Sequence, residues 1–475
     1  MSMILRNIFQ NKPISKTVIN FQIITSRRRI KTVSCAMDEV QIISTEAIKP
    51  SSPTPKHLRT YELSMLDQMF SNLYMPFVFF YSANKHQDFR KNSDFLKQSL
   101  AKTLTHYYPL AGRFIDSFSV ECNDHGVTFI EAHVGCDMSK FLQPPNMVVM
   151  QQLIPPSPQS LRLEASERAL LAVQVNYFST GDVAIGICIW HGLADGSAIS
   201  NFMKLWAEIN RGVNENICNN VVLDCTSLFP PHSSLKDQHI KPQLTSKVVF
   251  KRLFFDGKKI VALKEKVNKE IMVGSFDHEL QASRFMVVSS LIWGAFIAVA
   301  RERKRAINNK LYSHAMYYTM NLRSKMNPPM IPQCMGNIFR FVRAEWSLAE
   351  DDDIEATSLV KKVIKAKRNE SNVMNNIEYL GFMKDMNEAW EDSRSLTLTS
   401  VVGLRYYEAD FGWGKPVWLS IGSVSLPNAA LLSDTSDGKG VEAWVVLYEE
   451  DMDKFEKNPS IMAHASSNPS ILIAK

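Results

Sequence analysis

The sequence predicts an α/β fold of two domains, in which strand and helix patterns alternate along the chain. The chain has 475 residues, which is long for one hydrophobic core and suits two domains of ordinary size. Hydrophobic residues make up 45% of it and charged residues 21%, which is typical of a soluble globular protein. An irregular stretch rich in Asn, Ser and Pro separates the two halves. We therefore expect an N-terminal extension at 1–36, a first domain at 37–212, a crossover linker at 213–247 and a second domain at 248–475.

The extension is basic, and we set it apart from the fold. The first 37 residues hold seven Lys and Arg residues and no acidic residue before Asp38. Without them basic and acidic residues are nearly equal in number, which removes the main support for nucleic-acid binding. An Arg-rich segment without acids is typical of an organelle transit peptide, while Met37 offers an alternative start. We expect a cytoplasmic protein, or a mitochondrial or plastid one if residues 1–36 are a transit peptide.

Hydrophobic spacing predicts the elements of the first domain. A short helix starts near Ser64, a strand covers 76–81, and a helix covers 94–106. The clearest strand covers 183–191 and is apolar on both faces, which predicts a central, buried position in a sheet. A helix with one apolar side follows at 197–211.

The second domain is expected to begin with a strand at 247–255 and a helix at 258–270, with further strands toward the C-terminus. A 16-residue apolar run from Phe285 to Ala300 is too short for a typical membrane span, so we expect a buried core helix at 285–301.

The seven cysteines form no C-x-x-C pair, and their odd number favours a reducing compartment. We expect a monomer with no membrane or nucleic-acid partner.

The first candidate for chemistry is His191, where the buried strand breaks into a Gly-Leu-Ala-Asp-Gly turn. An imidazole in this place can face a cavity, and its ordinary pKa of about 6.5 suits proton transfer near neutral pH. Gly192 and Gly196 leave room for a substrate beside the ring. A His-x-x-x-acid spacing alone arises by chance about once in such a chain, and a core histidine is the alternative. Asp195 is expected to cap the helix that follows rather than to contact the imidazole.

The second candidate is the Asp-Phe-Gly-Trp-Gly segment from Asp410 to Gly414. Gly412 and Gly414 flank Trp413, so the segment predicts a tight turn with specific packing. Taken alone, it is compatible with a hairpin around a buried tryptophan. No glycine-rich loop, H-R-D or A-P-E segment accompanies it, which excludes a protein kinase.

Together the two motifs resemble those of the plant BAHD acyltransferases, and the resemblance covers nearly all of residues 38–475. The details are most similar to the vinorine-synthase-like branch of alkaloid and terpenoid O-acetyltransferases. Further family-like segments lie at 53–55, 63–67, 107–113, 321–324, 326–329, 336–337, 428–430 and 441–444.

The resemblance implies two similar chloramphenicol-acetyltransferase-like domains of mixed sheet and helices, joined by a crossover loop with a channel between them. It implies an acyl-CoA-dependent O-acyltransferase, with acetyl-CoA as the expected donor and a hydroxyl of a bulky alkaloid, terpenoid or limonoid as acceptor. Acyl-CoA is then a co-substrate, and no permanently bound cofactor, metal or covalent acyl-enzyme is expected.

The resemblance also assigns residue roles. His191 and Asp410 are the expected catalytic residues: His191 removes the acceptor's proton, while Asp410 supports the domain and the CoA channel from outside the reacting centre. Asp195 is expected to pair with an arginine, for which Arg323 is the candidate. Four glycines and one tryptophan of the two motifs are expected to support the site, namely Gly192, Gly196, Gly412, Trp413 and Gly414.

Three further positions carry expectations about the substrates. Ser400 is a candidate donor to the developing oxyanion. Val401 stands where many relatives have a tryptophan, which leaves more room at the reacting centre. Lys258 and Lys259, at the start of a helix, are candidates for contact with CoA phosphates, and a solvated helix face is the alternative.

Two other functions stay open at this point. A catalytically silent relative would bind a ligand or protein partner in the same channel. A peptide-synthetase condensation domain would share the histidine motif, but its usual doubled histidine is missing because Trp190 precedes His191.

Overall fold

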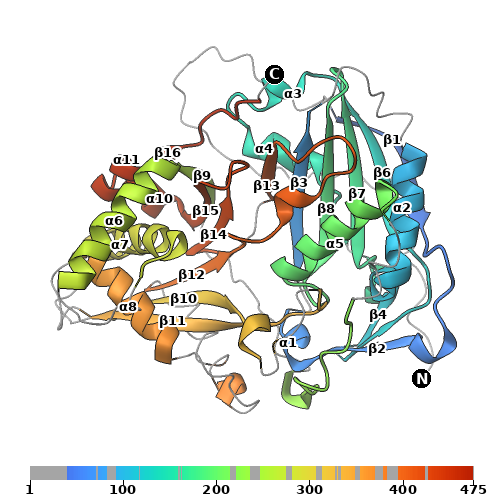
Figure 1. Ribbon diagram of the computed structural model, residues 1–475, viewed down its shortest axis with the longest axis horizontal. Helices are drawn as coiled ribbons and strands as arrows, with labels where there is room; N and C mark the ends of the chain where they lie inside the picture. Colours follow the sequence, from blue (N-terminus) through green and yellow to red (C-terminus); the bar gives the residue numbers. More distant parts are fainter. Residues whose placement is uncertain are drawn as a thin grey trace, which may run out of the picture. The chain divides into compact units, whose positions relative to one another are not determined.

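The structure is a computed structural model, and the predicted extension at 1–36 lies outside the residues that it describes. The described residues are 40–70, 73–82, 93–116, 118–158, 161, 163–213, 221–235, 247–273, 281–305, 313–326, 329, 333–347, 354–369, 378–381, 384, 394–422 and 426–473. They form a mixed α/β fold with two large sheets (Figure 1). The predicted fold class is therefore confirmed.

The first large sheet has six strands in the order β1-β6-β7-β8-β3-β13. Its strands are β1 (Val40–Ile48), β3 (Tyr74–Tyr81), β6 (Val127–Val134), β7 (Leu171–Phe178), β8 (Val183–Trp190) and β13 (Trp418–Ile421). The eight residues of β8 are all buried, and antiparallel neighbours pair with it on both sides. The predicted central strand is thus confirmed.

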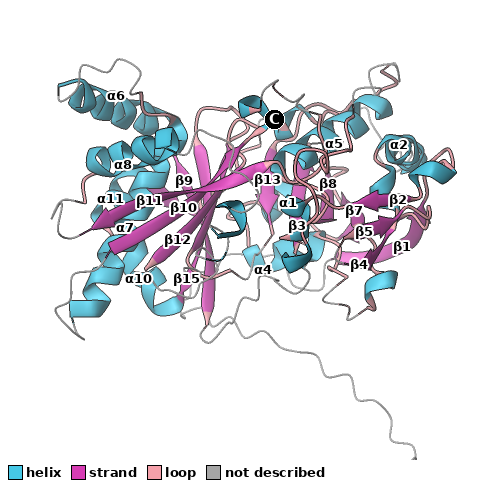
Figure 2. Ribbon diagram, turned by 90° about the horizontal axis from the view of Figure 1, so that it is seen from below, coloured by secondary structure: helices cyan, strands magenta, loops and turns pink. Residues whose placement is uncertain are grey.

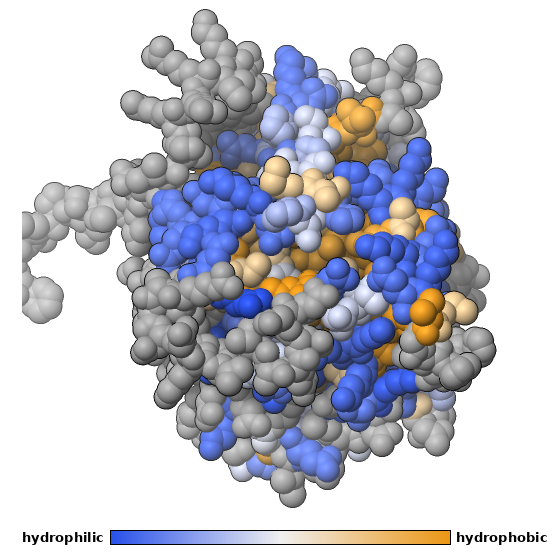
Figure 3. Space-filling view, turned by 90° about the vertical axis from the view of Figure 1, so that its left-hand side faces the viewer, coloured by the Kyte–Doolittle hydropathy of each residue, from blue (hydrophilic) through white to orange (hydrophobic). Residues whose placement is uncertain are grey.

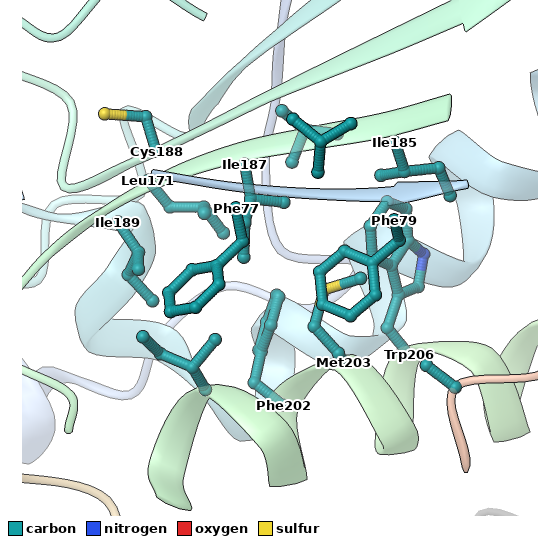
Figure 4. Packing of buried hydrophobic residues seen from close by; sticks show 14 of the residues in the cluster. Phe77, Phe79, Leu171, Ile185, Ile187, Cys188, Ile189, Phe202, Met203 and Trp206 are labelled. Carbon is teal, nitrogen blue, oxygen red and sulfur yellow. The ribbon is translucent and has the colours of Figure 1, made fainter. Parts of the chain in front are cut away.

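Two helices cover one face of this sheet. They are α2 (Ser93–His106) and α5 (Gly196–Asn210), which pack on each other. Phe202, Met203 and Trp206 of α5 point toward the apolar side chains of β3 and β8 (Figure 4). Both helices lie within one residue of the predicted ranges at 94–106 and 197–211.

The second large sheet has seven strands in the order β11-β10-β12-β14-β15-β9-β16. Its strands are β9 (Val248–Phe255), β10 (Ser313–Asn321), β11 (Phe339–Ser347), β12 (Ser395–Ser400), β14 (Ala429–Asp434), β15 (Val441–Tyr448) and β16 (Ala465–Ser467). The β10–β12 and β12–β14 pairs are parallel and the other pairs are antiparallel. The predicted strand at 247–255 is confirmed as β9.

Helices pack against the second sheet around α7 (Arg284–Arg305), as Figure 2 shows. The others are α6 (Gly257–Val273), α8 (Ala356–Asn369), α10 (Glu449–Glu456) and α11 (Pro459–His464). Within the described residues, α7 alone is long and apolar enough to cross a membrane, but 72% of its apolar window at 284–302 is buried inside the protein. Its packing is therefore that of the predicted core helix. On the outer face of this half, hydrophilic residues surround smaller apolar areas (Figure 3).

Short elements complete the fold. A small sheet has the order β2-β5-β4, with β2 (Thr60–Glu62), β4 (Arg113–Asp116) and β5 (Ser119–Glu121). Helices of a single turn include α1 (Met65–Gln68), α3 (Met138–Phe141) and α4 (Met147–Met150). Ser64 caps α1, as the predicted helix start requires.

One segment of the second half packs on the first sheet, which the division of the chain at 213–247 did not anticipate. Strand β13 pairs with β3, and Phe411 and Trp413 belong to the same apolar core as β8. Contacts between large aromatic side chains hold this segment on the first sheet. Trp413, for example, meets Tyr81 edge-on at a centroid distance of 5.5 Å. The domain boundaries themselves stay a prediction.

Candidate active site

A cavity of about 930 Å³ is lined by side chains from both halves of the chain. Phe70 and His191 come from the first half, while Phe339, Ser400 and Trp444 come from the second. Apolar and aromatic residues make up most of the wall, and the polar residues among them are largely uncharged Ser, Thr, Asn and Gln. This composition is typical of a small-molecule site.

His191 lies directly after β8 and faces this cavity. Its backbone N–H donates to Leu73 O at 2.8 Å, and its backbone carbonyl accepts from Asn337 Nδ2 at 2.6 Å. The Nδ1 atom is buried and makes no hydrogen bond to the described residues. Nε2 is therefore the ring nitrogen that can meet a ligand in the cavity.

Burial lowers the pKa of His191 below its ordinary value of about 6.5, against smaller opposing effects of its own backbone, of the Asp195 carboxylate and of the Asn337 side chain. The imidazole is therefore neutral at neutral pH. A neutral imidazole has the free electron pair that a general base needs.

The two glycines of the motif do not act alike. A Cβ on Gly192 would lie 2.5 Å from the indole of Trp190, so this glycine makes room for a core side chain and not for the substrate. This corrects our expectation for Gly192. Gly196 does line the cavity, and a Cβ there would meet Val401 Cγ1 at 2.9 Å.

Asp195 has a structural environment. It caps α5 by accepting from Ala198 N at 2.9 Å, and it accepts from Ile338 N at 3.1 Å. Two nitrogens of Arg323 donate to its carboxylate at 2.7 and 3.1 Å, and both residues are buried. The structure thus pairs Asp195 with Arg323, the arginine that the sequence suggested, and fills the carboxylate's acceptor positions without the imidazole.

Asp67 and Asn337 also belong to the site, although the sequence analysis did not select them as site residues. Asp67 Oδ1 accepts from the backbone N–H of Asn337 at 2.7 Å and from its Nδ2 at 2.9 Å. Asn337 in turn holds the carbonyl of His191. Burial raises the pKa of Asp67. Both lie in family-like segments, at 63–67 and 336–337, and this was the only signal available.

Ser400 and Val401 also line the cavity, and Val401 lies close to Gly196. Ser400 Oγ accepts from Val402 N at 3.2 Å, which leaves its hydroxyl hydrogen able to donate. Val401 lines the cavity and is 4% exposed. The role of Ser400 as oxyanion donor stays a prediction.

The turn from Asp410 to Gly414 is held by its own aspartate. Asp410 Oδ1 accepts from Gly412 N at 2.8 Å and from Gly414 N at 2.9 Å. Both glycines have positive φ, at 94° and 97°, which explains the residue type. Arg211 Nη1 lies 3.8 Å from the carboxylate. Asp410 is not among the residues that line the cavity, so its contribution is to the turn.

Lys258 and Lys259 lie at the start of α6 and do not line the cavity. Lys259 Nζ donates to Ala463 O at 2.9 Å, next to α11. A contact of these lysines with CoA stays a prediction, and this geometry does not favour it. Lys367 on α8, which the sequence analysis did not select, does line the cavity.

No three His, Cys, Asp or Glu side chains converge as metal ligands within the part of the chain that the structure describes. The expectation of a site without metal stays a prediction.

The geometry agrees with comparisons to known proteins. The family model described as "Transferase family" matches residues 38–462. The chain belongs to this family, the BAHD acyltransferases. It is 39% identical to a limonoid 21-O-acetyltransferase of Citrus sinensis, over 91% of this chain and the whole of that protein. It is 37% identical to vinorine synthase of Rauvolfia serpentina, over 87% of this chain and 95% of that protein.

Solved structures show the same fold. The crystal structure of vinorine synthase matches with a TM-score of 0.78 and 33% identity, over 90% of this chain and 99% of that chain. The F. sporotrichioides TRI101 structure with coenzyme A and T-2 matches with a TM-score of 0.66 and 14% identity, over 86% of this chain and 99% of that chain. At 14% identity this second match concerns the fold alone.

Replacing Arg323 by methionine tests the buried ion pair. We expect Arg323→Met to lower the free energy of unfolding by about 3–5 kcal/mol, because Asp195 then stays buried without its partner. Urea unfolding monitored by fluorescence measures this. Arg343→Met is the matched control, because Arg343 pairs with Glu345 at the surface at 3.4 Å and its loss should cost less than about 1 kcal/mol. Equal effects of the two substitutions would contradict the structural role of Arg323.

Replacing Asp410 by alanine tests the turn. We expect Asp410→Ala to lower the free energy of unfolding by about 2–3 kcal/mol, because two backbone N–H groups lose a charged acceptor. Thermal unfolding and soluble yield measure this. A fully stable variant that had lost turnover would show instead that Asp410 takes part in the chemistry.

Proposed function

We propose that the protein transfers the acetyl group of acetyl-CoA to a hydroxyl of a bulky, largely apolar metabolite. The observation that carries this proposal is a neutral, cavity-facing imidazole at the end of β8 in a chain of the BAHD family. The characterised relatives described above support the acetyl group by their names, since one is a limonoid O-acetyltransferase.

The reaction uses His191 as a general base. Nε2 removes the proton of the acceptor hydroxyl while the oxygen attacks the thioester carbonyl of acetyl-CoA. The tetrahedral intermediate then breaks its C–S bond, and the CoA sulfur leaves and takes the proton from His191. The products are the acetyl ester and free CoA, and no bond to the enzyme forms. General-base assistance of this kind accelerates a reaction by about 10²–10⁴-fold.

We infer that the oxyanion of this intermediate lies near Ser400. Its hydroxyl lines the cavity and retains a hydrogen to donate. A donor that is fixed before the reaction stabilises developing charge without having to reorient.

The cavity favours an apolar acceptor of the limonoid type. Among the described wall residues, the charged side chains are Asp195 and Lys367, and Arg323 neutralises Asp195. The valine at position 401 also leaves more volume than a tryptophan would. A triterpenoid alcohol fits such a wall, while a protonated alkaloid amine would enter without a free carboxylate to pair with. The comparisons give no support to the alternative of a catalytically silent relative.

Three expectations remain proposals of this account. They are a monomeric protein, the absence of membrane and nucleic-acid partners, and a cytoplasmic location, with a mitochondrion or plastid as the alternative if residues 1–36 are a transit peptide.

Replacing His191 tests the proposed function. Purified His191→Ala is expected to lose about 10²–10⁴-fold in kcat, because no other group replaces the base. The assay incubates enzyme, labelled acetyl-CoA and a panel of terpenoid and alkaloid alcohols, and detects acetyl esters by mass spectrometry. Turnover near the wild-type rate in the variant would refute the general-base role. Esters formed from basic alkaloids alone would refute the proposed acceptor class.

The pH dependence of the reaction reports on the same imidazole. Because burial lowers the pKa of His191, the base stays neutral and active as the pH falls through 6.5, and activity is lost only below the lowered pKa. We expect the ascending limb of kcat/KM to lie below the ordinary histidine value of about 6.5. Initial rates in overlapping buffers measure it. A limb above that value would contradict a buried, neutral base.

A further inference from the structure

Phe70 lies directly against the imidazole of His191, and the mechanism above does not use it. The two ring centroids are 4.5 Å apart and the ring planes differ by 18°, so the rings are stacked. Phe70 follows α1, lines the cavity and is 4% exposed. We propose that Phe70 is a positioning residue that holds the imidazole of His191 in its working orientation; this inference rests on the proposed function of His191.

The backbone around His191 is fixed, but the backbone does not fix the plane of the ring. Leu73 O holds the backbone N–H of His191, and Asn337 Nδ2 holds its carbonyl. The freedom that remains is rotation of the side chain about χ1 and χ2, and χ2 of histidine has broad minima. Nδ1 makes no hydrogen bond of ordinary geometry to the described residues, and the polar contacts that act on the ring come from Asn337 and from the backbone of His191 and Ala194. These weak contacts leave room for a second constraint on χ2.

The phenyl ring supplies this second constraint. Rotation of the imidazole about χ2 would drive its edge into the face of Phe70, since the stacked rings are already in contact. The stack therefore confines the imidazole to orientations parallel to the phenyl plane. With Nδ1 directed into the protein, Nε2 is then kept toward the cavity.

Phe70 is itself held in place. Its ring packs against Phe339 of β11 at a centroid distance of 5.2 Å. Its backbone N–H donates to Asp67 O at 3.1 Å, and its carbonyl accepts from Leu73 N at 3.1 Å. Asp67 is the residue that also holds Asn337. Asp67 (through Asn337), Phe70 and Leu73 thus together fix the backbone and the ring plane of His191.

Phe70 also covers one face of the imidazole against water. Burial is the largest cause of the lowered pKa of His191, and a phenyl ring in contact with the imidazole is part of that burial. A smaller residue at position 70 would admit water to this face. The ring thus acts on two measurable quantities, the turnover rate and the position of the pH profile.

Substitution by leucine separates orientation from burial. Phe70→Leu keeps an apolar side chain but removes the flat ring, so we expect kcat to fall by about 10-fold to 100-fold, with KM for acetyl-CoA unchanged within about threefold. Phe296→Leu is the matched control, because Phe296 is equally buried in the same apolar core and does not line the cavity. We expect kcat of folded Phe296→Leu to stay within about twofold of wild type.

Substitution by alanine tests the effect on water. Phe70→Ala is expected to move the ascending limb of kcat/KM upward, toward about 6.5, while Phe296→Ala leaves it in place. If Phe70→Ala does not fold, the comparison of Phe70→Leu with Phe296→Leu still tests the positioning role of Phe70. A kcat of Phe70→Leu within about twofold of wild type, or an equal loss in Phe296→Leu, would overturn the proposal. His191→Ala in the same assay separates the proposed function from the role of Phe70. If His191→Ala is active, the proposed function is refuted. If His191→Ala is inactive while Phe70→Leu is as active as wild type, only the role of Phe70 is refuted.

Discussion

The buried ion pair between Asp195 and Arg323 is the contact on which the active site depends. It joins the turn after β8, in the first half of the chain, to a segment of the second half. Two charges in a dry interior are costly unless their hydrogen bonds are complete. In this pair nearly all hydrogen-bonding positions are filled. The carboxylate also accepts from Ala198 N and Ile338 N, and the guanidinium also donates to the carbonyls of Cys334 and Gly336. Loss of either charge would leave the other buried without a partner and would destabilise the fold. Because the pair joins the two halves of the chain, it also holds together the two sides of the cavity.

The same arrangement explains why the motif's two polar residues have different functions. The Asp195 carboxylate accepts from the arginine and from two backbone N–H groups, and among the described residues no hydrogen bond joins it to the imidazole. His191 lies four residues before the helix cap Asp195, with its backbone fixed by Leu73 and Asn337 and its ring stacked on Phe70. A base fixed in this way needs no carboxylate partner for orientation. It stays neutral at working pH because it is buried, and it is ready to accept a proton from a hydroxyl in the cavity.

The sequence predicted what depends on local pattern. The apolar run at 183–191 predicted a central strand, which is seen at Val183–Trp190, and Asp195 caps the next helix as expected. Other features depend on contacts between distant segments, which a single sequence does not reveal. The packing of residues 411–421 on the first sheet, the link from Asp67 through Asn337 and the stack on Phe70 are of this kind. Gly192 was misjudged because the indole of Trp190 folds back over it, and Lys258 and Lys259 were selected by charge alone.

The most direct test of this account compares Asp195→Asn, Arg323→Met and the double variant in unfolding and in turnover. If the pair is structural, the double variant buries no unpaired charge, so it should be more stable than either single variant by about 1–3 kcal/mol. Its turnover should then recover toward the wild-type rate. A double variant that regains stability but stays as inactive as Asp195→Asn would contradict the account, because Asp195 would then act on the imidazole itself.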